Sequence, residues 1–259
     1  MHSHTNFWSY CSESRLPSLV CALSLAWISN SAIGRPTNIT QGETAMSPPY
    51  CIYKDGFEDS QASGQFSPGA KHWQSILGDG FRTLHHYCWA HVSMQRAMRH
   101  DTPRNLREHY LGDAVADDWF VIKNTKSDFI LLPEVYTHIG KLELMRSRPQ
   151  EANKAFAQAR ALKPDYWPAY SHWAEFLIRA GQRAEAKQVV KSGLEYSPKA
   201  KVLQEQYRLL GGNPAEIVPK VKTIQAAESV DDSSIPPIIE EPEADPTPVG
   251  APPAATTDR

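Results

Sequence analysis

The sequence predicts an all-α fold, a superhelical solenoid of antiparallel helix pairs, and two observations carry this prediction. The first is an internal period. The strings around Pro164 and Pro198 occupy equivalent places 34 residues apart, and periods of roughly 20–50 residues are typical of repeat architectures. The second is that small and aromatic residues recur at matching places in each unit. Stacked helices need such residues, because each helix pair buries its apolar face only against its neighbours.

Alignment on the two prolines places a first repeat at residues 133–166 and a second at 167–200. The small, aromatic and aliphatic positions of the first repeat are Tyr136, Ile139, Gly140, Ala152, Phe156 and Ala159. Those of the second are Tyr170, Trp173, Ala174, Ala186, Val190 and Gly193, with Gly181 at the expected turn. This pattern resembles the tetratricopeptide-repeat family over residues 133–212. The resemblance implies paired helices, with the first helix of each pair lining a groove for a protein partner.

The first repeat departs from the family pattern in two places. Glu143 takes a position that a large apolar or aromatic residue usually holds. The string Ser147-Arg148-Pro149 replaces the usual glycine-containing turn.

Helices are also predicted on both sides of the repeats. Residues 201–212 are expected to form a capping helix that ends at Gly211-Gly212. Residues 68–132 are expected to be a helical region with a degenerate repeat. Its apolar residues recur at helical spacing, with a break near Gly78-Asp79-Gly80.

The amino-terminal segment has the layout of an export signal. An apolar run from Leu16 to Ile28 is followed by small residues up to Ala32, which is the pattern that signal peptidase reads. We expect a signal peptide at residues 1–32, a linker at 33–67 and a periplasmic or secreted protein. The alternative is a chain translated from Met46, which would stay in the cytoplasm.

Four cysteines are present, and none forms a Cys-x-x-Cys pair. Export would remove Cys11 and Cys21, and the two that remain, Cys51 and Cys88, would be expected to form one disulfide in an oxidising compartment. In a reducing compartment they would be buried or idle thiols. Short strings around Cys51 and Cys88 and the string Asp128–Glu134, followed by the repeats, look like those of uncharacterised exported bacterial tetratricopeptide-repeat proteins. That likeness supports export and the Cys51–Cys88 link.

Residues 213–259 are expected to be a linker and a disordered, acidic, proline-rich tail. From Glu228 onward the composition is rich in Pro, Glu and Asp, contains no aromatic residue, and has Arg259 as its single basic residue. Such a chain buries too little apolar surface to offset its ordering entropy.

The predicted function is that of an adaptor or scaffold that binds a protein or peptide partner through the groove of the repeats. The expected groove residues are Thr137, Lys141, Met145, Ser171, Glu175 and Arg179. The chain shows no phosphate-binding loop, dinucleotide fingerprint or zinc-protease motif. We therefore expect no enzymatic activity and no cofactor.

One alternative function comes from a second class. Cys51, His85, Cys88 and His91 are residue types that bind zinc or copper, so they could form a metal-binding or redox-active module. The formal net charge of −2 argues against nucleic-acid binding. The longest apolar run is too short for a transmembrane helix.

Overall fold

The computed structural model describes residues 35–57 and 67–220, and all regular structure within these ranges is helical. The predicted signal peptide and the predicted tail beyond residue 220 lie outside the described residues. The α-helices are α1 (Gln41–Ala45), α2 (Pro68–Leu77), α3 (Leu84–Ala97), α4 (Arg104–Asn124), α5 (Leu132–Met145), α6 (Pro149–Leu162), α7 (Trp167–Arg179), α8 (Arg183–Tyr196) and α9 (Lys201–Leu209). The short 3₁₀ helices within the described residues are η1 (Pro49–Tyr53), η2 (Gly78–Thr83) and η3 (Pro214–Glu216).

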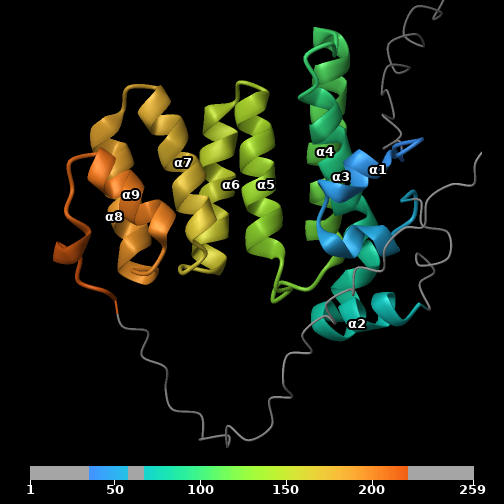
Figure 1. Ribbon diagram of the computed structural model, residues 1–259, viewed down its shortest axis with the longest axis horizontal. Coiled ribbons are helices and arrows are strands. Elements are labelled where there is room, and N and C mark those ends of the chain that lie inside the picture. The colour runs from blue at the N-terminus through green and yellow to red at the C-terminus, as the bar shows by residue number, and fades with distance from the viewer. Residues whose placement is uncertain (1–34, 58–66, 221–259) are drawn as a thin grey trace, which may run out of the picture. The chain divides into compact units, whose positions relative to one another are not determined.

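The helices from α3 to α9 pack as successive hairpins. α3 contacts α4, α5 contacts α6 and α7 contacts α8, and each hairpin also contacts the next one in chain order. Figure 1 shows these helices standing side by side in their order along the chain. The predicted all-α solenoid fold is confirmed.

Prolines begin three of the repeat helices. α5, α6 and α7 each carry a proline in the first turn, at Pro133, Pro149 and Pro168. A helix does not need the amide hydrogen of its first residues for internal hydrogen bonds, so proline is well tolerated there.

The turns within the two repeats share one backbone geometry despite different sequences. After α7, Gly181 has a positive φ of 78°, and Gln182 N–H donates to Leu177 O at 2.8 Å. After α5, Ser147 takes the same role with a φ of 58°, and Arg148 N–H donates to Glu143 O at 2.8 Å. Both are Schellman-type helix ends. The Ser-Arg-Pro string therefore builds the same turn as the glycine, with backbone strain at Ser147.

Glycines let the repeat helices approach closely. A Cβ added at Gly140 of α5 would lie 2.7 Å from Phe156 Cε1 on α6. A Cβ at Gly193 of α8 would lie 2.7 Å from Leu203 Cδ1 on α9 and 2.9 Å from the Tyr170 ring. These contacts belong to the apolar core that runs from α6 to α9.

The segment expected as a linker at 33–67 is instead packed where it is described. Ile39, Tyr50, Cys51 and Phe57 are buried and join a core that includes α2, η2 and α3. The prediction of a linker is wrong for residues 35–57. These residues form only short helices, α1 and η1, which leave no periodic signal in the sequence.

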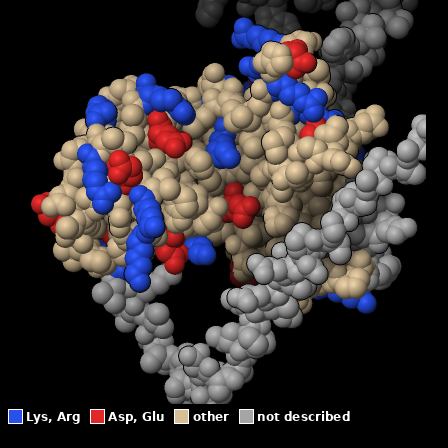
Figure 2. Space-filling model, in the orientation of Figure 1, with Lys and Arg blue, Asp and Glu red and all other residues tan. Residues whose placement is uncertain are grey.

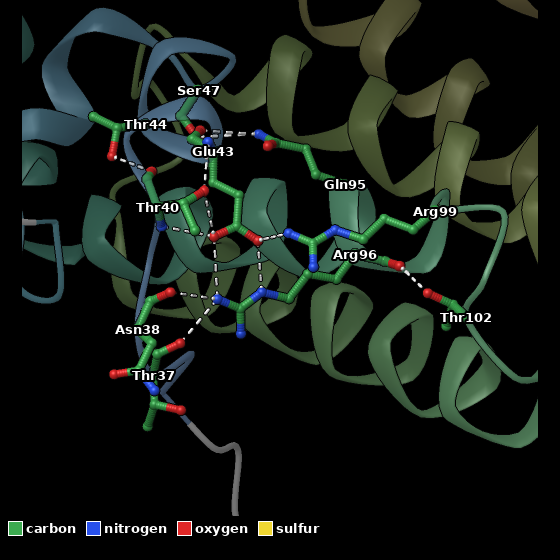
Figure 3. Close-up of polar contacts among 10 residues, drawn as sticks. All are labelled: Thr37, Asn38, Thr40, Glu43, Thr44, Ser47, Gln95, Arg96, Arg99 and Thr102. Carbon is green, nitrogen blue, oxygen red and sulfur yellow. Dashed lines mark hydrogen bonds and ion pairs between the residues drawn. The ribbon is translucent and has the colours of Figure 1, made fainter.

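Glu43 fixes this segment to α3. Thr40 and Glu43 form a capping box at the start of α1. Figure 3 shows the Glu43 carboxylate between Arg96, whose Nε donates at 2.7 Å, and Arg99, whose Nη2 donates at 2.8 Å. Burial alone would raise the pKa of Glu43, but the hydrogen bonds from Arg96 and Thr40 outweigh it and lower the pKa.

Candidate functional site

The predicted groove residues fall into a buried pair and an exposed set. Thr137 and Ser171 are only 4% and 3% exposed. Thr137 Oγ1 donates to Pro133 O at 2.8 Å, and Ser171 Oγ accepts from Gln206 Nε2 at 2.9 Å. The prediction that these two side chains line a groove therefore needs correction. α5 and α7 contact each other, so short side chains along them are covered, whereas longer ones reach the surface.

The other four predicted residues lie at or near the surface. Lys141 is half-buried, while Met145, Glu175 and Arg179 are exposed. Burial lowers the pKa of Lys141, and the carboxylates of Glu175 and Glu134 partly oppose that shift. Lys141 of α5 therefore lies within electrostatic range of Glu175 on α7.

His172 is a further member of this surface that sequence reasoning missed. Its Nδ1 lies 3.6 Å from Glu175 Oε2, three residues along α7. Burial lowers the pKa of His172, and Lys141 lowers it further. We call Lys141, Met145, His172, Glu175 and Arg179 the α5/α7 face. It offers hydrogen-bond donors, acceptors and one flexible thioether.

The four residues of the metal or redox alternative do not form one site. Cys51 Sγ and Cys88 Sγ lie 2.01 Å apart, at the distance of a disulfide, and both residues are fully buried. His85 Nδ1 lies 2.9 Å from Arg82 O, while the ring of His91 stacks on His138 with centroids 4.3 Å apart. Within the described ranges, no three His, Cys, Asp or Glu side chains gather as a metal site. The structure gives the alternative no support.

A buried polar network joins α3, α4 and α5, and sequence reasoning did not find it. His86 Nδ1 of α3 lies 2.6 Å from Asp117 Oδ1 of α4. His138 Nδ1 of α5 lies 2.7 Å from Asp118 Oδ2 of α4. Tyr87 OH of α3 donates to Glu134 Oε1 of α5 at 3.0 Å. We call these three pairs, with His91, the buried polar network.

Burial governs the protonation of this network. Asp118 is 0% exposed and its pKa is raised well above the usual value by burial, and further by Asp117 and Glu134. Burial lowers the pKa of His138 to about 3 and that of His91 well below its usual value. Desolvation disfavours every charged form in such a place.

The role of the buried polar network is to hold helices together. Asp118 and His138 meet almost no solvent, so a substrate does not reach them in this conformation. Each pair bridges two different helices, and together the pairs set how α5, the first repeat helix, sits on α3 and α4. The adjacent acids Asp117-Asp118 within a helix that buries Ala114, Val115 and Val121 were the one sequence signal for it.

Comparisons with known proteins bear on the repeats alone. A family model for the tetratricopeptide repeat matches residues 143–207, from the end of α5 to α9. Comparison with curated proteins and with solved structures gives no match. Within residues 35–57 and 67–220, no helix combines the length and apolar character needed to cross a bilayer. The prediction that this part of the chain is made of tetratricopeptide repeats is confirmed for residues 143–207.

Proposed function

We propose that this tetratricopeptide-repeat protein is an adaptor that binds a protein or peptide partner through its α5/α7 face. Tetratricopeptide repeats are a protein–protein interaction module, and the match over residues 143–207 is the observation that carries the proposal. Stacked helix pairs offer a rigid surface whose side chains are set by the scaffold. The proposal includes no catalytic step, since the family is typically non-enzymatic.

The character of the α5/α7 face supports a polar ligand. It carries Lys141 and Arg179 beside Glu175, with Met145 at its end. Figure 2 shows that Lys and Arg lie interspersed with Asp and Glu over the described surface on the side drawn. A partner with side chains of both signs, held by hydrogen bonds more than by apolar burial, fits this surface.

A paired substitution tests the face. Lys141→Ala with Arg179→Ala should keep the helical circular-dichroism signal and lower recovery of native-host partners by about tenfold, which corresponds to about 1.4 kcal/mol. The matched control is Lys191→Ala with Lys201→Ala, two exposed lysines on α8 and α9. Equal recovery from both double variants and the unchanged protein would sink the proposal.

We also propose that the protein is exported and works in the bacterial cell envelope or outside the cell. The bonded geometry of Cys51 and Cys88 supports an oxidising compartment, because disulfides persist there and are rare in the cytosol. The export signal expected at residues 1–32 points the same way.

Intact mass of protein from its native host tests export. The proposal expects loss of about 30 residues and two thiols that appear only after reduction. A chain that begins at Met1 or Met46, with free thiols before reduction, would place the protein in the cytoplasm instead.

A further inference from the structure

A pocket of about 390 Å³ lies between α4 and α6, on a side of α5 different from the α5/α7 face. Trp119 of α4, Tyr136 and Glu143 of α5, and Glu151 and Lys154 of α6 contribute to its walls. The pocket is not part of the α5/α7 face, and the family match gives it no role.

The repeat itself explains why the space is open. Glu143 of the first repeat corresponds to Leu177 of the second, 34 residues on. Leu177 is 1% exposed and belongs to the apolar core of its repeat. Glu143 is also buried, at 6% exposed, but its carboxylate does not pack as an aliphatic side chain does. The position that is apolar core in the second repeat therefore carries a carboxylate in the wall of this pocket.

The carboxylate of Glu143 is only half satisfied. Its Oε1 accepts from Arg146 Nη1 at 2.9 Å. Its Oε2 is buried and has no hydrogen-bond partner among the described residues. A buried acceptor without a donor is costly, and a charge-assisted hydrogen bond to it is worth more than a neutral one. Arg146 Nε is likewise buried without a hydrogen-bond partner among the described residues, so the Arg146–Glu143 pair is joined through Nη1 and Oε1 alone and leaves Glu143 Oε2 without a donor.

The aromatic walls favour a donor that carries positive charge. Trp119 is 40% exposed, so part of its ring is open to solvent at the pocket. It meets the Tyr136 ring edge to face, with centroids 6.0 Å apart. Indole and phenol faces attract ammonium and guanidinium groups within about 6 Å.

Two cations already lie near these acids. Arg146 occupies one oxygen of Glu143, and Lys154 Nζ lies 2.9 Å from Glu151 Oε1. The Lys154–Glu151 pair is largely exposed, and such pairs contribute little. An incoming cation can therefore displace Lys154 from Glu151, whereas Arg146 leaves Glu143 Oε2 free.

We propose that the α4–α6 pocket binds a lysine or arginine side chain of a protein partner. The aliphatic part of that side chain packs on Trp119 and Tyr136, and its charged end donates to Glu143. This site is independent of the α5/α7 face. A negative result for one site therefore leaves the proposal for the other site intact.

The test titrates N-acetyl-lysine methylamide into the full chain and follows the indole N–H resonance of Trp119, assigned with Trp119→Phe. The resonance should shift and saturate, while the uncharged analogue N-acetyl-norleucine methylamide should leave it unmoved. Glu143→Gln, which keeps the shape of the side chain, should weaken binding at least about tenfold. Glu175→Gln on the α5/α7 face is the matched control and should bind as the unchanged protein does.

Glu143→Leu restores the residue type of the second repeat, and should abolish the shift while raising thermal stability. Equal shifts with the norleucine analogue, or no shift with the lysine analogue, would overturn the proposal. Tighter binding of tetramethylammonium than of the lysine analogue would also overturn it, because the pocket would then suit a free organic cation.

Discussion

The junction of α3, α4 and α5 and the stack of α6 to α9 use the same helical hairpins but different side chains. At the junction, His86–Asp117, His138–Asp118 and Tyr87–Glu134 bridge the helices, and Cys51–Cys88 ties the amino-terminal segment to α3. In the stack, Phe156, Tyr170, Trp173 and Leu177 pack against alanines and glycines.

The contacts that distinguish the junction are directional polar pairs, whereas those of the stack are non-directional apolar contacts. Buried polar pairs stabilise only when both partners are present in good geometry, so the junction specifies one placement of α5. Apolar packing tolerates small shifts and is shared over many residues. We infer that the junction fixes where the repeats begin, and that the repeats then propagate by themselves.

A large effect is expected from breaking one buried pair. Asp118→Ala should lower the free energy of unfolding by about 2–4 kcal/mol, because it leaves the neutral His138 ring buried without a hydrogen-bond partner and a cavity in place of the carboxyl group. Urea unfolding measures this. The double variant Asp118→Leu with His138→Leu should recover most of the loss, since it leaves no polar group unpaired. If Asp118→Ala lowers the free energy of unfolding by less than about 1 kcal/mol, as expected for a surface pair, the buried pairs do not specify the placement of α5.

The disulfide comes next. Cys51 and Cys88 close a loop with a sequence separation of 37, and the chain-entropy model assigns such a loop about 3–4 kcal/mol. Thermal unfolding with and without reductant should show that loss. The Cys51→Ala with Cys88→Ala variant should be insensitive to reductant. A reductant effect that persists in this variant would show that the loss has another source.

A glycine pair compares a close contact between the junction and the stack with an open helix surface. Gly140→Ala should cost about 1–3 kcal/mol, because its Cβ meets Phe156 in the stack. Gly112→Ala on α4 should instead stabilise by about 0.5–1 kcal/mol, since nothing lies within 4 Å of a Cβ there. Both values come from denaturant midpoints. If Gly112→Ala lowers the free energy of unfolding as much as Gly140→Ala does, helix propensity and packing do not explain the effects of the two substitutions.

The last effect is a pH dependence that His91 gives to the junction. Burial lowers the pKa of His91, which faces His138 and Lys141. Its neutral form is favoured in the folded state, so the unfolded chain takes the proton first. The stabilisation is complete above the unfolded pKa of about 6.5 and is lost below it, at about 1.4 kcal/mol per pH unit.

His91→Phe, which keeps a ring against His138, should reduce this acid sensitivity between pH 7 and pH 5 by the His91 share. The raised pKa of Asp118 acts in the opposite direction, but it is present in both proteins and cancels in the comparison. Identical pH profiles for the two proteins would contradict the burial of His91.

The same contrast explains what the sequence could reveal. The stack follows from a period of 34 residues: Ala152 is matched by Ala186, and the apolar Phe156 by the apolar Val190. The helices from α5 to α9 could therefore each be predicted from the sequence. The junction has no period. Its pairs join residues 31, 20 and 47 positions apart, and no local pattern links a histidine to an aspartate at such distances.

The candidate site was predictable to the same extent. Position in the repeat located Lys141, Glu175 and Arg179 at the surface, because helix geometry places them there. It failed for Ser171, since α9 supplies Gln206 to that hydroxyl, a contact set by tertiary packing. Glu143 was recognised as a departure from the repeat, but its pocket depends on Trp119 of α4, outside the two regular repeats.

Hydrogen exchange with mass spectrometry, on the oxidised and the reduced protein, tests the contrast between the regions most directly. Reduction of Cys51–Cys88 should remove protection from peptides of residues 35–57, α3 and α4, while peptides of α7, α8 and α9 keep theirs. A uniform loss of protection from α3 through α9 would show one cooperative unit, and would contradict a junction and a stack that are stabilised separately.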